Sequence, residues 1–112
     1  MAGKILIVED NSRFAEILAI LLNEAGYETS LATSSGQGIH KALTERPDLI
    51  LTDLNLPDMT AIEAITTLKN IPSTASIPML FLPPRLLVNW KQKHSKRGQQ
   101  SIYLNLSATR FD

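Results

Sequence analysis

The chain has 112 residues, 44% of them hydrophobic and 20% charged, with no cysteine and a formal net charge of zero. This length suits a single domain, and the lack of cysteine excludes disulfides, thiolate metal sites and thiol catalysis. No apolar run approaches the roughly 20 residues that span a bilayer, and the first residues lack the pattern of a secretion signal. We therefore expect a cytoplasmic globular protein.

The charge is unevenly distributed along the chain. Residues 1–82 hold five basic and ten acidic residues, a net charge of −5, whereas residues 83–112 hold six basic residues and one acid, a net charge of +5. The regular spacing of apolar residues ends at the same point. Residues 83–112, the basic tail, are therefore a basic arm, an ordinary polar extension, or sequence that was not selected to belong to this fold.

The chain begins with a predicted strand and helix. Residues 5–8 are an unbroken apolar, largely β-branched run, which is typical of a strand buried on both faces. Asn11 or Ser12 is expected to cap the helix that follows, and Gly26 is expected to end it. This order of strand, cap, helix and glycine predicts one complete strand–helix unit.

A second unit follows with weaker signals. Residues 27–32 predict a strand. A helix is expected to begin at Ser34 or Ser35 and to end before Pro47, because proline is poorly tolerated inside a helix.

In the third unit the sequence signals of strand and helix are again clear. Residues 49–51 predict a core strand ending in Asp53, Thr60 is expected to cap a third helix, and residues 79–82 predict a fourth strand. The inward face of the third helix is expected to hold Ile62, Ile65 and Leu68. Strands that alternate with helices predict right-handed βαβ units and an α/β, doubly wound parallel sheet.

Acidic residues follow two of the core strands. Glu9 and Asp10 end the first, and Asp53 ends the strand at 49–51. The carboxyl ends of parallel strands share one edge of the sheet, where ligands bind at a topological switch point. Carboxylates that converge there repel one another and favour a cation, and an all-oxygen ligand set suits Mg²⁺.

Each acid also has an ordinary structural interpretation. Asp10 suits a cap or turn before the helix, Glu9 a solvated strand end, and Asp53 a turn. The joint pattern, with two apolar strands of one βαβαβ unit both ending in acids, favours a metal site.

Three motifs resemble the receiver domain of two-component response regulators: KILIVEDN at 4–11, LILTDLNLPDM at 49–59 and SIPMLFL at 76–82. The resemblance implies the flavodoxin-like receiver fold over residues 1–82. It also implies that Asp53 accepts a phosphoryl group from a sensor histidine kinase or phosphotransfer protein. Glu9, Asp10, Asp53 and the backbone carbonyl of Asn55 would hold Mg²⁺. Such a protein is a stoichiometric acceptor and not an enzyme, and neither a membrane nor a nucleic acid is expected as its partner.

The chain departs from the family pattern at several positions. Ala61 replaces the glycine usual shortly after the Pro-x-Met turn, which would strain a turn that needs a positive φ. Pro83 stands where the family has Ser or Thr, no Lys-Pro follows, and residues 101–106 are the one candidate for a fifth strand. We therefore expect a fold that lacks its fifth strand and last helix, marginal stability and impaired phosphorylation.

A shifted reading frame would account for the basic tail. When the third base of each codon is read with the first two of the next, the junction of Leu82 and Pro83 permits Thr. From the junction of Ser95 and Lys96 onward the permitted series is Glu, Ala, Gly, Ala, Thr, Val, Tyr, Leu, Ser, Lys, Pro and Phe. The permitted Thr and Lys are 22 positions apart, as in the family. A single-base deletion near codon 82 would produce such a tail.

Three other functions compete with that of a phosphoacceptor. One is a pseudo-receiver, a protein-interaction module with the same fold and no phosphotransfer. Another is a metal-dependent phosphohydrolase, which lacks support because residues 52–58 offer no nucleophile paired with a general acid. The third is nucleic-acid binding by the basic tail, which would weaken steeply with salt; the tail lacks amphipathic order.

Overall fold

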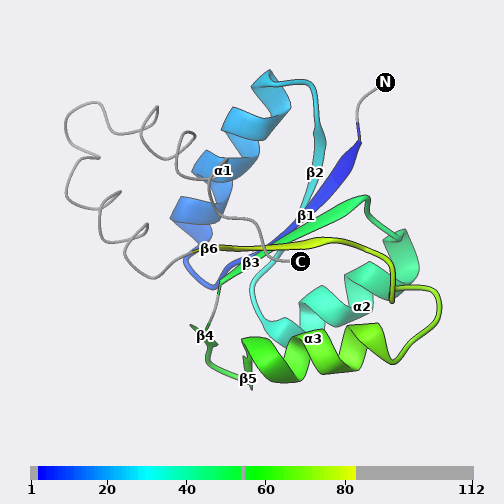
Figure 1. Cartoon of the computed structure of the whole chain (residues 1–112). Helices are drawn as coiled ribbons and strands as arrows, with labels where there is room; N and C mark the ends of the chain where they lie inside the picture. The colour runs from blue at the N-terminus through cyan, green and yellow to red at the C-terminus, as the bar shows by residue number, and fades with distance from the viewer. Residues whose placement is uncertain (1–2, 54, 83–112) are drawn as a thin grey trace.

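The computed structural model describes residues 3–53 and 55–82, which form a parallel sheet between helices (Figure 1). The sheet consists of β1 (Lys4–Val8), β2 (Glu28–Ala32), β3 (Leu49–Asp53) and β6 (Met79–Leu82), in the order β2-β1-β3-β6. Each neighbouring pair of these strands is parallel. The predicted α/β class and parallel sheet are confirmed.

Three helices connect the strands. α1 (Ser12–Glu24) follows β1, α2 (Ser35–Glu45) follows β2, and α3 (Ala61–Lys69) lies between β3 and β6. A short antiparallel hairpin, β4 (Asn55–Leu56) and β5 (Met59–Thr60), separates β3 from α3. From β1 the chain first moves to β2 on one side and then to β3 on the other, so the edge between β1 and β3 is a topological switch point.

The sheet is covered on both faces. α1 lies on one face, and α2 and α3 lie on the other (Figure 1). Because side chains alternate along a strand, Ile5 and Ile7 of β1 pack in the α1 layer with Phe14, while Leu6 and Val8 pack in the opposite layer. All four side chains of this run are buried, as its unbroken apolar pattern predicts.

The helix ends confirm the predicted caps. The Asn11 side chain accepts a hydrogen bond from the Phe14 amide at 2.9 Å and begins α1. Gly26 follows this helix with φ of 101°, a conformation that glycine adopts without a steric penalty. Ser34 caps α2, and that helix ends before the buried Pro47.

Two expectations about α3 are wrong. Ile62 was expected to face inward but is 75% exposed. Ala64 and Leu68 are buried against the sheet and Ile65 packs beside them, and helical spacing places Ile62 nearly opposite Ala64, on the solvent side. Ala61 itself has no positive φ, since Arg46 and Gly26 are the described residues that adopt one. The strain expected at Ala61 is therefore absent.

The expected fifth strand at 101–106, Pro83 and the whole basic tail lie outside the described residues. The expected incompleteness of the fold and the shifted frame therefore stay predictions. No helix in residues 3–53 and 55–82 is long and apolar enough to span a bilayer.

Candidate metal site

The structure brings three of the predicted site residues together. Glu9 and Asp10 follow β1, and Asp53 ends the adjacent strand β3. One carboxylate oxygen from each residue lies within 4.8 Å of the other two. This acidic cluster lies at the carboxyl end of the sheet, at the switch point between β1 and β3.

Glu9 is the buried member of the acidic cluster, with a relative exposure of 1%. Its Oε2 accepts a hydrogen bond from the Asn11 amide at 2.9 Å, and its own amide donates to the carbonyl of Ala32 at 2.9 Å. The interpretation of Glu9 as a solvated strand end is therefore wrong.

Burial has an electrostatic consequence for Glu9. Loss of hydration raises the pKa of its carboxyl group to about 8, and the side chain of Asp10 and the charge of Asp53 act in the same direction. A buried carboxylate beside two others either takes up a proton or requires a positive charge that neutralises it. A bound cation would supply that charge.

The other two acids are more accessible. Asp10 is exposed and Asp53 is half-buried, so the acidic cluster opens to solvent on one side. Asp10 is not the cap of α1, because Asn11 occupies that position. Asp53 pairs with Leu82 across β3 and β6, and its carbonyl accepts a hydrogen bond from the hydroxyl of Thr52 at 3.2 Å. The sheet therefore fixes the backbone of Asp53.

The fourth predicted ligand is the backbone carbonyl of Asn55. Asn55 begins the β4–β5 hairpin two residues after Asp53 and pairs with Thr60, while Leu56 pairs with Met59. Leu56 is buried at 8% exposure in the layer that contains α2 and α3. Three carboxylates, one of them desolvated, make the hard, anionic oxygen set that suits Mg²⁺.

Asp58 has a role that the sequence did not reveal. It lies in the turn between β4 and β5. Its Oδ1 accepts a hydrogen bond from the Ser35 amide at 3.0 Å, and its Oδ2 accepts one from the Gly36 amide at 2.9 Å. These backbone hydrogen bonds hold the pKa of Asp58 below its usual value. No local motif links this turn to a helix more than 20 residues earlier.

Thr60 caps α3, as predicted, and Glu63 completes a capping box. The Glu63 amide donates to the Thr60 hydroxyl at 3.3 Å, and Glu63 Oε1 accepts from the Thr60 amide at 2.9 Å. Glu63 is not among the residues predicted from the sequence, although the spacing Thr-x-x-Glu is the signal for this motif.

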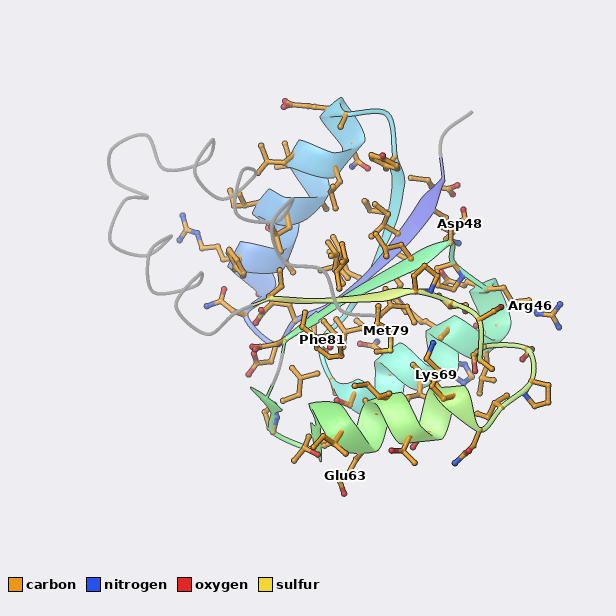
Figure 2. The ribbon with its side chains drawn as sticks, viewed as in Figure 1. Arg46, Asp48, Glu63, Lys69, Met79 and Phe81 are labelled. Atoms are coloured by element: carbon orange, nitrogen blue, oxygen red, sulfur yellow. The ribbon has the colours of Figure 1, made fainter. Side chains whose placement is uncertain are left out.

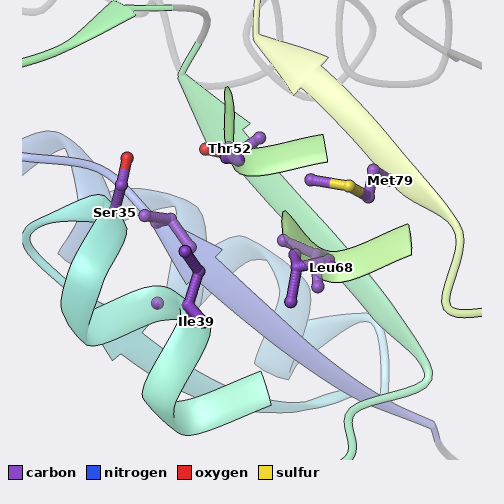
Figure 3. A pocket seen from close by; sticks show the side chains of 9 residues that line it. Ser35, Ile39, Thr52, Leu68 and Met79 are labelled. Atoms are coloured by element: carbon purple, nitrogen blue, oxygen red, sulfur yellow. The ribbon is translucent and has the colours of Figure 1, made fainter. Parts of the chain in front are cut away.

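A small cavity lies between α2, α3 and the sheet (Figure 3). Its volume is about 10 Å³, close to the lower limit for one water molecule. Ser35 and Ile39 of α2, Thr52 of β3, Leu68 of α3 and Met79 of β6 are among its lining residues. This cavity is therefore a gap in the packing and not a site for a small molecule.

Comparison with known sequences places the chain in a family. Residues 5–83 match the family model of the response regulator receiver domain. The phosphate regulon transcriptional regulatory protein PhoB of Pseudomonas aeruginosa is 40% identical over 83 residues, which are 73% of this chain and 36% of PhoB. The polar-differentiation response regulator DivK of Brucella anthropi is 32% identical over 113 residues, covering 99% of this chain and 91% of DivK. The chain thus spans about a third of the length of relatives such as PhoB.

Solved structures show the same fold. The chemotaxis response regulator CheY4 of Vibrio cholerae superposes with a TM-score of 0.74 at 22% identity, covering 96% of this chain and 98% of CheY4. The receiver domain of a signal transduction histidine kinase from Syntrophus aciditrophicus gives a TM-score of 0.70 at 28% identity, covering 96% of this chain and 89% of that domain. The match to the family model over most of the chain, the relatives and the shared fold together show that this chain belongs to the response regulator receiver domain family of two-component signalling.

Proposed function

We propose that this receiver domain accepts a phosphoryl group on Asp53, with Mg²⁺, from a sensor histidine kinase or a phosphotransfer protein. The observation that carries the proposal is the acidic cluster, in which oxygens of Glu9, Asp10 and Asp53 lie within 4.8 Å of one another at the switch point. The choice of Asp53 is supported by its place at the end of β3, in the motif that resembles the family's acceptor motif.

The transfer is an in-line displacement. A carboxylate oxygen of Asp53 attacks the phosphorus of a phosphohistidine, the P–N bond breaks with its electron pair remaining on nitrogen, and that imidazole nitrogen takes up a proton from solvent. The product is an acyl phosphate on Asp53. When bound, Mg²⁺ neutralises the charge on the equatorial oxygens of the phosphoryl group.

The remaining site residues would hold the ion. Glu9 and Asp10 would contribute carboxylate oxygens, and Asn55 its backbone carbonyl. The burial of Glu9 suits this role, because the attraction between a carboxylate and a cation is stronger away from water, and the cation in turn keeps the carboxylate ionised at neutral pH. The chain is then modified once per molecule and is not an enzyme.

We also propose that transfer is slow in this chain. The family's hydroxyl residue after the fourth core strand is replaced by Pro83, and no Lys-Pro follows. Removal of one donor to a developing negative charge costs enzymes a factor on the order of 10² to 10³ in rate. The loss of two groups that would contact the phosphoryl oxygens therefore favours impaired phosphorylation.

The test is intact-protein mass after incubation with acetyl phosphate, with and without Mg²⁺. We expect a gain of one phosphoryl group per chain that needs Mg²⁺ and is absent in Asp53→Asn. Asp48→Asn is the matched control, because Asp48 lies at the opposite end of β3 and should accept the group normally.

Two results would contradict the proposal. Continued hydrolysis of the donor without accumulation of modified protein would indicate a phosphohydrolase. A folded protein that gains no mass would favour the second candidate, a pseudo-receiver that acts as a protein-interaction module. The observation that favours this second candidate is the replacement of the hydroxyl residue by Pro83.

A further inference from the structure

Asp58 accepts hydrogen bonds from backbone amides at the N-terminus of α2. The first amides of a helix have no partner within it, and here Ser35 and Gly36 donate theirs to the two oxygens of Asp58. The Gln37 amide donates to the hydroxyl of Ser34 at 3.1 Å, and the Gly38 amide to the carbonyl of Ser34 at 2.9 Å. All four amides of this first turn are therefore used, two of them by a residue from another segment.

The same residue fixes the hairpin that follows Asp53. Asp58 lies in the turn between β4 and β5. Leu56, on one side of the turn, is buried, and Thr60, on the other side, caps α3. The hairpin is thus attached to α2 by Asp58 and to α3 by Thr60. The first residue of the hairpin, Asn55, pairs with Thr60. The contacts of the hairpin with α2 and α3 therefore also fix the backbone of Asn55.

We propose that Asp58 is a positioning residue of the phosphoacceptor site. Asp58 binds the hairpin to the first turn of α2 and so fixes the backbone carbonyl of Asn55, which would be a ligand of Mg²⁺. This role rests on the proposed function. Asp58 touches neither the ion nor the phosphoryl group; it acts through the backbone between residues 55 and 60.

A carboxylate suits this position for two reasons. Its two oxygens match two amide donors, whereas an asparagine side chain offers only one acceptor. Its charge is favoured at a helix N-terminus, where the helix dipole is positive. The hydrogen bonds from Ser35 and Gly36 lower the pKa of Asp58, so it is ionised at neutral pH.

The chain contains a matched control. Asp48 Oδ2 accepts a hydrogen bond from the Lys4 amide at 2.8 Å, so it too is an exposed aspartate that binds a backbone amide of another segment. Figure 2 shows Asp48 at the start of β3, at the end of the sheet opposite the hairpin. Asp58→Asn and Asp48→Asn therefore make the same chemical change at opposite ends of the molecule, but only Asp58→Asn leaves an amide without its acceptor, because one oxygen suffices at Asp48.

The experiment uses the full chain without phosphodonor and measures Mg²⁺ affinity by calorimetry. Asp58→Asn is expected to weaken Mg²⁺ binding about tenfold, the low end of the effect of residues that support metal ligands. Asp48→Asn is expected to leave the affinity within about twofold of the unaltered value. Amide hydrogen exchange at Ser35 and Gly36 should also become faster in Asp58→Asn and stay unchanged in Asp48→Asn.

Equal Mg²⁺ affinities in the two variants would overturn the positioning role. If Asp58→Asn does not fold, Ser35→Pro tests the same contact from α2: it removes the Ser35 donor, while proline suits the first position of a helix. It is expected to weaken Mg²⁺ binding in the same way, and an unchanged affinity would overturn the role. Mg²⁺ binding by the unaltered chain is measured before any variant is compared. If the unaltered chain binds no Mg²⁺, the proposed function itself is overturned.

Discussion

Gly38 of α2 lies directly against Val8 of β1. A Cβ atom added at residue 38 would be 2.8 Å from Val8 Cγ2 and 3.1 Å from Val8 Cγ1. Val8 is buried at 4% exposure in the layer that contains α2 and α3. This close approach sets the distance of α2 from the sheet, and α2 in turn receives Asp58 at its first turn.

Gly38→Ala is therefore expected to destabilise the protein by about 1–3 kcal/mol, the range for overpacked cores. Gly36→Ala is the matched control in the same helix. A Cβ there would make ordinary contact with Asp58 Oδ2 at 3.5 Å, so the better helix propensity of alanine should stabilise by about 0.5 kcal/mol. Urea unfolding measures both. Destabilisation by both variants to the same extent would contradict the contact with Val8.

Thr60→Val is expected to lower the free energy of unfolding by about 1 kcal/mol, as loss of a helix N-cap does. Valine keeps the shape of threonine but cannot accept the hydrogen bond from the Glu63 amide. Thr66→Val, at an exposed position of the same helix, controls for the change of side chain within α3. If the two variants unfold alike in urea, the capping box does not stabilise this helix.

Glu9 makes the stability of the metal-free protein depend on pH. Its pKa is about 8 in the folded chain against an ordinary value of 4.5, so the native state holds a proton that the unfolded state releases. The stability that this group contributes is complete below about pH 4.5 and is lost as the pH rises through about 8. Stability measured in a chelator should therefore fall between pH 6 and pH 9.

Glu9→Gln should remove this fall, because glutamine does not titrate. At pH 9 the variant is expected to be more stable than the unaltered protein by at least about 1 kcal/mol. This minimum is smaller than the free energy that corresponds to a shift of one pKa unit. The acids with lowered pKa values, Glu45, Asp58 and Glu63, titrate below this window and do not obscure the result. A parallel decline in both proteins would show that another group is responsible.

The origin of the basic tail is tested by the gene sequence across codons 75–112, translated in all three frames. A shifted frame that reads Leu-Thr-Ala at codon 82 and later Lys-Pro-Phe would show that the parent is an ordinary receiver. Function then belongs to that parent. If no frame restores these motifs, the tail is native and the pseudo-receiver becomes the leading interpretation.

The sequence predicted the elements whose signals are local. The unbroken apolar run of β1 indicated burial on both faces. The sequence also predicted caps at Asn11 or Ser12, at Ser34 or Ser35 and at Thr60, and the structure has Asn11, Ser34 and Thr60. The meeting of Glu9 and Asp53 also followed from the sequence, because parallel strands of one βαβαβ unit end at the same edge.

Other features depended on contacts between elements and were not predictable. The start of α3 was predicted correctly at Thr60, but which of its apolar residues face the sheet depends on how the helix packs, and Ala64 takes the buried position in place of Ile62. The burial of Glu9 depends on how the chain between β1 and α1 packs. Asp58 did not stand out in the sequence, because its partners Ser35 and Gly36 come from a distant helix.

The central claim is that Asp53 is the phosphoacceptor, and borohydride trapping tests it most directly. The full chain is incubated with acetyl phosphate and Mg²⁺ and then reduced with borohydride, which converts an aspartyl phosphate to homoserine, and its peptides are analysed by mass. We predict homoserine at position 53, and none when Mg²⁺ is removed by a chelator. Homoserine at another acid, or a modified chain with no homoserine, would contradict the assignment.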